Sequence, residues 1–426
     1  MWNEKRRVWK QKPLFKKGAA FLLFFIIVCL CILVLPFSCN AEELPEELQN
    51  LHALSAVLMD ADSGRVLEEK EGNVMRPMAS TTKIMTCILA LEEGNPEDEV
   101  VVSAEAARQP AVHLGMREGQ SFRLGDLLYS LMLESHNDTA VAIAEYIGGS
   151  VEGFAKKMNK KAMEIGCGHA YFITPNGLDA SDKMGAHSIS ATDLATIMSY
   201  CVLKSPKAEQ FITITRTNSY SFQDLSGTNS YSCQNHNSFL NMMEGALSGK
   251  TGFTGDAGYC YVGALKRDNR TFVVALLGCG WPNNKNYKWE DTRKLMEYAI
   301  ENYTYKKIPV VQDFQSLAVT DGMREGIGLF QPVTMTVGVE GEEKEFLYLM
   351  KTGENLHAEI SRKTSLTAPV QVGEKIGTLT YYLDEEPVKS YDLVTKEGVE
   401  RISLKYVVQN LFRMYLDFSG LVYMKR

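Results

Sequence analysis

The spacing of hydrophobic residues changes twice along this chain of 426 residues, which limits the folds that it can adopt. Residues 53–70 alternate apolar and polar side chains around the turn signal DADSG, which predicts a hairpin of two strands. From about residue 80 to 203 the apolar residues recur at helical spacing, and beyond residue 245 the spacing of two returns. One sheet assembled from both ends of this region, with helices inserted between them, is the economical arrangement, so we expect an α+β fold.

Two further regions follow the predicted sheet. Short alternating segments such as VTMTVGV and KIGTLTYYL predict a small all-β domain over residues 307–394. Residues 395–426 have helical spacing and fit an amphipathic helix at a membrane surface, or a helix docked on the β domain. Its apolar stripe contains Leu404, Val408, Leu411, Tyr415, Phe418 and Val422, and its basic residues are Arg401, Lys405, Arg413, Lys425 and Arg426.

The first 41 residues differ from the rest. A basic stretch precedes the apolar run AAFLLFFIIVCLCILVLPF, and small residues lead up to Ala41, which is typical of a signal peptide. The run is almost long enough to span a bilayer, so a retained N-terminal membrane anchor stays open as the alternative. Either way we expect the body of the protein to lie outside the cytoplasmic membrane.

Charge and cysteine usage exclude several classes of partner. Residues 1–41 carry seven basic residues against Glu4, so the rest of the chain has a net charge of −13 instead of −7. An acidic exported protein argues against nucleic acid as a partner. The six cysteines of the body are scattered, with no CxxC pair, which argues against a metal site and leaves disulfides open. We expect no cofactor.

The stretch MASTTKIMT places Ser80 three residues before Lys83, at the start of a predicted helix. A serine hydroxyl becomes a nucleophile when a base takes its proton, and a lysine three residues on lies on the same helix face. Lysine acts as that base only if burial or a nearby cation lowers its pKa. The same four residues also occur in ordinary capped helices, so this motif alone does not decide between chemistry and capping.

Two more short motifs follow in order. Ser135 and Asn137 flank His136 between two helical segments, where a turn can present a hydroxyl and an amide to one point. Lys-Thr-Gly occurs at Lys250, in a predicted strand beside small residues, and again at Lys351 in the predicted β domain. We favour Lys250, because it precedes a hairpin in the same region as Ser80.

With these three motifs in this order, the chain resembles the penicillin-recognising serine enzymes, most closely the D-alanyl-D-alanine carboxypeptidases of the low-molecular-weight penicillin-binding proteins. RPMASTTKIMT, LMLESHNDTAVAIAEYIGGS and GKTGFTGDAGYCYVGALKRD all read like that family. The resemblance implies a β-lactamase/transpeptidase-like catalytic domain over residues 42–306, an antiparallel sheet with a helical insertion. It also covers the β domain and the amphipathic tail.

The resemblance implies a catalytic role for three residues. Ser80 attacks the carbonyl of a terminal D-Ala-D-Ala bond in a peptidoglycan stem peptide and forms an acyl-enzyme, with Lys83 as its base. Ser135 relays the proton to the leaving amine, while Asn137 holds the substrate and Lys83. The same acylation makes β-lactam antibiotics inhibitors of such enzymes.

The resemblance also implies a set of substrate-binding residues. Lys250, Thr251 and Gly252 form the strand motif, whose lysine and threonine bind the terminal carboxylate. The N–H groups of Ser80 and Phe253 form the oxyanion hole, although the position of Phe253 is often His in this family. Lys288 aligns with a family arginine that helps hold the carboxylate, and a lysine offers a point charge in place of a fork.

Other functions on this scaffold remain as alternatives. A β-lactamase needs an efficient deacylation base, typically a Glu, and the corresponding stretch FITPNGLDASDKMGAHS contains none. A wall-binding protein without catalysis is the second alternative, and acylation of Ser80 distinguishes it from an enzyme. Endopeptidase activity on wall cross-links would use the same residues. We expect an exported enzyme at the outer face of the cytoplasmic membrane or in the cell wall.

Overall fold

The computed structural model describes residues 44–418. The predicted leader, residues 1–41, and the last residue of the apolar stripe, Val422, lie outside the described residues.

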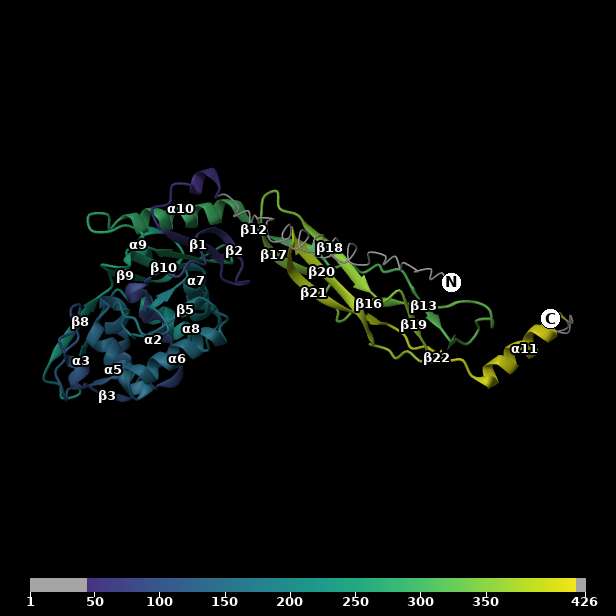
Figure 1. The fold of residues 1–426 in the computed structure, drawn as a ribbon, viewed down its shortest axis with the longest axis horizontal. Helices are drawn as coiled ribbons and strands as arrows, with labels where there is room; N and C mark the ends of the chain where they lie inside the picture. Colours follow the sequence, from purple (N-terminus) through teal and green to yellow (C-terminus); the bar gives the residue numbers. More distant parts are fainter. Residues whose placement is uncertain (1–43, 419–426) are drawn as a thin grey trace, which may run out of the picture. The chain divides into compact units, whose positions relative to one another are not determined.

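A five-stranded antiparallel sheet, in the order β2-β1-β11-β10-β9, organises the region that carries the three motifs (Figure 1). Strand β1 pairs with β11 along its length, from Ser55 opposite Leu277 to Asp60 opposite Phe272. The prediction of one sheet assembled from both ends of the region is therefore confirmed. The strands are β1 (Ser55–Asp60), β2 (Val66–Lys70), β9 (Ala246–Thr254), β10 (Gly258–Arg267) and β11 (Arg270–Leu277).

Helices cover both faces of this sheet (Figure 1). Helix α7 (Ala191–Ser199), from the block inserted between β2 and β9, packs on β1, β10 and β11, and α10 (Tyr287–Asn302) packs on the same strands from the other side. Every residue of β1 and β11 is buried. Because successive side chains of a strand point to opposite faces, this burial requires both covers.

The inserted block is mostly helical, as its spacing predicts. Helix α2 (Lys83–Glu93) lies at its centre, and all of its residues from Lys83 to Leu91 are buried. The other elements are η2 (Ala79–Thr82), β3 (Glu99–Val101), α3 (Ala104–Ala107), β4 (Ser121–Arg123), α4 (Leu124–Tyr129), η3 (Ser130–Glu134), α5 (Asn137–Gly148), α6 (Val151–Glu164), β5 (Ala170–Tyr171), β6 (Ser188–Ile189), η4 (Tyr200–Lys204), α8 (Ala208–Arg216), β7 (Ser219–Gln223), β8 (Ser230–Gln234) and α9 (Phe239–Met242).

The region after α10 is built from strands around a hydrophobic cluster of its own, which confirms its predicted all-β character. Leu379 and Leu393 are fully buried in that cluster. The strands are β12 (Tyr303–Pro309), β13 (Leu317–Thr320), β14 (Gly322–Met323), β15 (Val333–Met335), β16 (Val337–Val339), β17 (Glu345–Lys351), β18 (Leu356–Arg362), β19 (Ser365–Thr367), β20 (Lys375–Leu383), β21 (Glu386–Thr395) and β22 (Glu400–Arg401).

The amphipathic segment forms helix α11 (Leu404–Phe418), whose described residues include none that is buried. Tyr406 of α11 contacts the β region. Its hydroxyl donates to the carbonyl oxygens of Arg324 at 3.2 Å and Ile327 at 2.6 Å. Within residues 44–418, no helix is both long and apolar enough to cross a bilayer. The predicted domain boundary at residue 306 falls inside β12, and β22 precedes α11 within the predicted tail.

We predict that the thiols of the body are protected in the native protein. All six are free and buried, and burial raises the pKa of the Cys260 thiol to about 12. Because the thiolate is the reactive form, a thiol reagent should label these residues only after unfolding. Mass mapping of the labelled, native full-length chain tests this. Rapid labelling at Cys87, Cys167, Cys201, Cys233, Cys260 or Cys279 would contradict the packing described above.

Candidate active site

Ser80 lies in the short turn η2, directly before helix α2. Ala79, the residue before it, has φ of +48°, in the left-handed region that residues other than glycine seldom adopt. Such a conformation persists only where neighbouring contacts hold it, and such positions cluster at active sites. Ser80 also gains from the α2 dipole, because the N-terminus of a helix stabilises negative charge.

Lys83 is fully buried and makes three polar contacts. Its Nζ lies 2.9 Å from Ser80 Oγ, 2.9 Å from Asn137 Oδ1 and 2.7 Å from the carbonyl oxygen of Asn176. Among the described residues, no carboxylate forms an ion pair with it. Desolvation, with a further contribution from the charge of Lys250, therefore lowers the pKa of Lys83 well below its usual value.

The motif at Ser135 contacts the Lys-Thr-Gly motif at Lys250. Ser135 follows one π-helical turn and has φ of +67°, in the left-handed region. Lys250 Nζ, on β9, lies 2.9 Å from Ser135 Oγ and 2.9 Å from the carbonyl oxygen of Thr251. Burial lowers the pKa of Lys250 to about 7. The structure thus brings together Ser80, Lys83 and Asn137 on one side, and Ser135 and Lys250 on the other.

Strand β9 is an edge of the sheet, and its glycine lies against the nucleophile. A Cβ on Gly252 would meet the backbone N of Ser80 at 2.9 Å and the Cβ of Ala79 at 3.0 Å. Only glycine allows this approach. Thr251 is half-buried, while Phe253 is 43% exposed and its ring centroid lies 4.6 Å from that of Tyr259. The unpaired edge of β9 leaves backbone groups available to an extended ligand.

Lys288 lies apart from this cluster of contacts. Its Nζ donates to the carbonyl oxygen of Lys285 and lies 4.7 Å from the ring centroid of Tyr259 and 4.9 Å from that of Trp289. Burial lowers its pKa, and no described carboxylate pairs with it. No hydrogen bond joins it to Thr251 or Lys250 among the described residues, so a role in holding a carboxylate stays a prediction.

The second Lys-Thr-Gly has a different environment. Lys351 Nζ pairs with Glu68 Oε1 at 3.1 Å and lies 5.0 Å from the ring centroid of Tyr298. Its polar partner is an acid, whereas the ammonium of Lys250 faces a hydroxyl. The choice of Lys250 on sequence context agrees with this difference.

Several residues at the site escaped the sequence analysis. The segment before β6 contributes the carbonyl of Asn176, whose side-chain Nδ2 donates to Gln109 Oε1 at 2.9 Å. Gly177 has φ of +84°, and a Cβ there would overlap the carbonyl oxygen of Ala79. The turn signal Asn-Gly was visible in the sequence, but its contact with Ala79 was not. His136 is buried, with Nδ1 2.8 Å from Ser130 Oγ.

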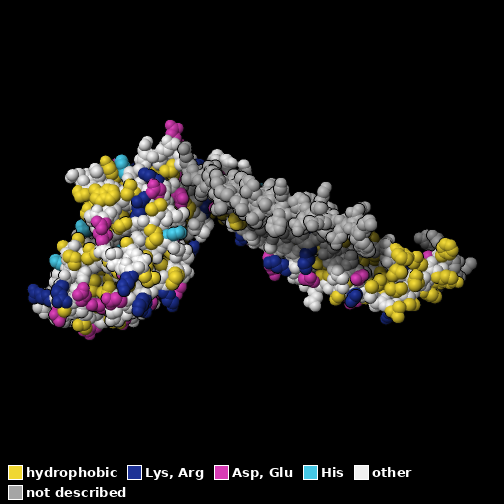
Figure 2. All heavy atoms as spheres, viewed as in Figure 1, with side chains coloured by type: hydrophobic (Ala, Val, Ile, Leu, Met, Phe, Trp, Pro, Cys, Tyr) yellow, Lys and Arg dark blue, Asp and Glu magenta, His cyan; other side chains and the backbone are white. Residues whose placement is uncertain are grey.

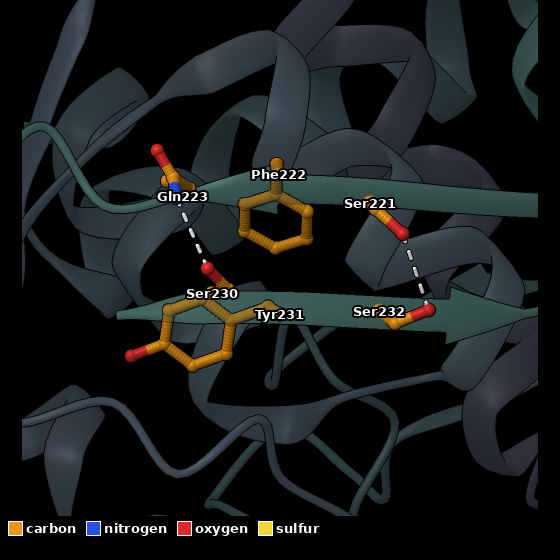
Figure 3. A pocket seen from close by; sticks show the side chains of 6 residues that line it. All are labelled: Ser221, Phe222, Gln223, Ser230, Tyr231 and Ser232. Carbon is orange, nitrogen blue, oxygen red and sulfur yellow. Dashed lines mark hydrogen bonds between the residues drawn. The ribbon is translucent and has the colours of Figure 1, made fainter. Parts of the chain in front are cut away.

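A shallow hollow lies on the β7–β8 hairpin and is lined by Ser221, Phe222, Gln223, Ser230, Tyr231 and Ser232 (Figure 3). Gln223 Nε2 donates to Ser230 Oγ at 3.1 Å, and Ser221 Oγ donates to Ser232 Oγ at 3.3 Å. None of the residues that line it belongs to the three motifs. The site of the motifs is instead the junction of η2, the turn at Ser135 and the edge of β9.

Comparison with known proteins relates this geometry to a family. A family model described as D-alanyl-D-alanine carboxypeptidase matches residues 40–280, and a model of the penicillin-binding protein 5 C-terminal domain matches residues 327–401. The chain is similar to D-alanyl-D-alanine carboxypeptidase DacF of Bacillus subtilis, with 31% identity over 82% of this chain and 86% of the relative. It is also similar to DacB2 of Mycobacterium tuberculosis, with 34% identity over 52% of this chain and 73% of the relative.

Solved structures share the fold. Penicillin binding protein 5 from Haemophilus influenzae matches with a TM-score of 0.63 and 24% identity, over 82% of this chain and 98% of that one. Penicillin binding protein 6B from Escherichia coli matches with a TM-score of 0.58 and 26% identity, over 84% of this chain and 98% of that one. These likenesses confirm the predicted β-lactamase/transpeptidase-like architecture followed by an all-β domain.

We predict that Gly177→Ala disrupts the nucleophile turn. The added Cβ would overlap the carbonyl oxygen of Ala79 and would also strain a backbone with positive φ, so the rate at which Ser80 is acylated should fall by about 100-fold. Stopped-flow acylation by a penicillin measures it. Gly168→Ala is the matched control, because a Cβ there meets nothing within 4 Å. Equal rates for the two variants would contradict the contact.

We predict that Lys250→Met loses activity yet raises thermal stability at pH 7. The variant removes a buried ammonium without a carboxylate partner, and a Tm increase of about 5 °C is expected. The unfolded lysine keeps its proton up to about pH 10.5, while the folded one loses it near pH 7, so wild-type stability rises with pH between these values. The advantage of the variant should therefore shrink as pH rises toward 10.5.

Thermal unfolding of both proteins across this pH range makes the measurement. Lys351→Met is the control with the opposite sign, because it leaves Glu68 without its ion-pair partner and should lower Tm. A lower Tm for Lys250→Met at every pH would show that Lys250 stabilises the fold.

Proposed function

The chain belongs to the D-alanyl-D-alanine carboxypeptidase family, and we propose that Ser80 is the nucleophile with which it removes the terminal D-Ala from peptidoglycan stem pentapeptides. The observation that carries the proposal is Lys83, a buried amine that lies 2.9 Å from Ser80 Oγ and has no carboxylate partner among the described residues. Burial lowers the pKa of such an amine well below its usual value, so it gives up its proton more readily than an exposed lysine and can then accept one from a serine.

Acylation begins with proton transfer from Ser80 Oγ to the neutral amine of Lys83. The oxygen then attacks the carbonyl carbon between the two D-Ala residues, and negative charge develops on the carbonyl oxygen. The backbone N–H groups of Ser80 and Phe253 bind that charge, supported by the N-terminus of α2. Asn137 Oδ1, 2.9 Å from Lys83 Nζ, keeps the amine in place throughout the step.

Expulsion of D-Ala needs a proton at the leaving nitrogen. Ser135 Oγ gives its proton to that nitrogen and recovers one from the protonated Lys83, so the C–N bond breaks and the acyl-enzyme remains. Lys250 and Thr251 bind the terminal carboxylate meanwhile. An anion beside Lys250 raises its pKa, so the bound substrate keeps the ammonium charged.

Deacylation repeats the chemistry with water as the nucleophile. Lys83 takes a proton from water, the oxygen attacks the ester carbonyl, and Ser80 leaves with the proton as the shortened peptide is released. A β-lactam reacts by the same first attack, which opens its ring. The amine released by ring opening stays tethered to the acyl group, so no leaving group departs to make room for water.

The place of action is also part of the proposal. Apolar side chains gather on α11 (Figure 2), where Leu404 is 81% exposed and Phe418 is 97% exposed. A helix that exposes such a stripe beside basic residues suits the surface of an anionic bilayer. We propose that the chain is exported through its N-terminal leader, residues 1–41, and rests on the outer face of the cytoplasmic membrane through residues 395–426. The catalytic segment would then be 42–306 and the β segment 307–394.

Covalent labelling tests the proposed function. Purified protein incubated with a fluorescent penicillin should form a stable adduct, and peptide mapping should place it on Ser80 and find none in Ser80→Ala. Penicillin turnover without an adduct would favour a β-lactamase instead, and no reaction would favour a wall-binding protein without catalysis.

The two Lys-Thr-Gly sequences provide a second prediction. Lys250→Ala should lower kcat/KM for a D-Ala-D-Ala peptide by about 100-fold or more, because the substrate carboxylate loses its cation. Lys351→Ala should leave kcat/KM within about twofold, because that ammonium pairs with Glu68. Release of D-Ala measures both. The reverse pattern would place the substrate at the other Lys-Thr-Gly.

A further inference from the structure

His187 is a buried imidazole that the proposed reaction does not use. It lies directly before β6 and is 3% exposed. Its Nδ1 accepts hydrogen bonds from the backbone N–H groups of Ile173 at 2.9 Å and Thr174 at 3.3 Å. Two N–H donors at one ring nitrogen require a lone pair there, so the ring proton is on Nε2. Burial lowers the pKa of His187 to about 4, which keeps the ring neutral at neutral pH.

The other ring nitrogen begins a directed chain of hydrogen bonds. His187 Nε2 lies 2.9 Å from Thr82 Oγ1, and Thr82 Oγ1 donates to the carbonyl oxygen of Ala79 at 2.8 Å. Because Nε2 carries the proton, it donates to the hydroxyl, and the hydroxyl proton is free to donate onward to the carbonyl. The chain therefore has one direction, from imidazole to hydroxyl to carbonyl.

The carbonyl at the end of this chain belongs to the same peptide group as the N–H of Ser80. In a trans peptide these two bonds lie in one plane and point in opposite directions, so a hydrogen bond that fixes the carbonyl also aims the N–H. The backbone N of Ser80 lies beside β9, where a Cβ on Gly252 would meet it at 2.9 Å. A hydrogen bond accepted by the carbonyl also polarises the peptide group and strengthens its N–H as a donor.

The same imidazole also holds the segment of residues 173–176, which contacts Lys83. Ile173 and Thr174, which donate to Nδ1, lead directly into Asn176, whose carbonyl oxygen accepts a hydrogen bond from Lys83 Nζ at 2.7 Å. The segment is anchored again by Thr86 Oγ1, which donates to the carbonyl oxygen of Pro175 at 2.6 Å. One ring thus joins the peptide group of the nucleophile to the backbone that holds the base.

We propose that His187 is a positioning residue that acts through Thr82 on the Ala79–Ser80 peptide group, and so orients and polarises the oxyanion donor of Ser80. The proposal rests on the proposed function, because it needs Ser80 to be the residue that is acylated. The left-handed conformation of Ala79, with φ of +48°, is the local feature that this chain of hydrogen bonds holds in place.

The test separates the acylation rate constant from noncovalent binding, with full-length protein, a penicillin and stopped-flow kinetics normalised to reactive sites. Thr82→Val keeps the side-chain shape and removes the hydroxyl, so it should lower the acylation rate constant by about 10- to 100-fold with Kd within about twofold. Thr82→Ser returns the hydroxyl and should recover most of the rate. His187→Phe, which lacks both nitrogens, should lower the rate at least as far as Thr82→Val.

The double variant Thr82→Val/His187→Phe tests whether the two residues act as one chain. It should be no slower than the slower single variant, because the second change interrupts a chain that is already broken. Thr196→Val is the matched control: Thr196 Oγ1 donates to the carbonyl oxygen of Thr192 at 2.9 Å within α7, and its loss should leave the rate constant unchanged.

The outcomes separate the two proposals. If the wild type forms no adduct on Ser80, the proposed function fails and the positioning role fails with it. If the wild type forms that adduct and Thr82→Val is acylated at the wild-type rate, the positioning role alone is overturned. Effects confined to Tm, with the rate constant per reactive site unchanged, would also overturn it. Thr82→Val keeps the test decisive even if His187→Phe does not fold.

Discussion

The burial of the Lys83 amine against Ser80, with no carboxylate to pair with it, is the constraint on which the rest of the site depends. Taking an ammonium out of water costs several kcal/mol, and here the charge of Asp138 opposes that cost only in part, because burial and Lys250 together still lower the pKa of Lys83. The amine instead has three neutral oxygens around it, from Ser80, Asn137 and Asn176. Such an environment stabilises the neutral form, and this is the form that a base for serine needs.

Helices that pack on both faces of the central sheet stabilise the fold that holds this site. Turn η2 carries Ser80 and the first residue of helix α2 is the buried Lys83, while the N-terminus of α5 brings Asn137 to the same point. Strand β9 completes the site from the edge of the sheet, where Gly252 allows the strand to approach the nucleophile turn. Three chain segments far apart in sequence therefore meet around Ser80 and Lys83.

Much of this arrangement follows from sequence, for identifiable reasons. The spacing of apolar residues predicts the helical insertion, because burial of one helix face leaves a periodic pattern, while short apolar segments that flank turn signals predict the strands. The order of Ser80, Ser135 and Lys250 predicts which side chains meet. The context of the two Lys-Thr-Gly sequences separates Lys250, which faces Ser135, from Lys351, which pairs with Glu68.

Other features of the site leave no pattern in the sequence. The carbonyl of Asn176 is a backbone atom, which any residue could supply, so its contact with Lys83 has no sequence signature. The ring of His136 is buried against Ser130, although His136 stands in a turn between two helical segments. The hydrogen bond between His187 and Thr82 joins residues 105 positions apart, which only the folded chain brings together.

The protonation state of Lys83 is the most direct test of the account. Lysine labelled with 13C at Cε, with the Lys83 signal assigned by its loss in Lys83→Met, reports that state by NMR as pH is varied. The account predicts a midpoint well below 10.5, and a penicillin acylation rate that rises over the same pH interval. A midpoint at or above 10.5, with acylation already at its plateau near neutral pH, would show that Lys83 is charged when Ser80 reacts, and the proposed base would be wrong.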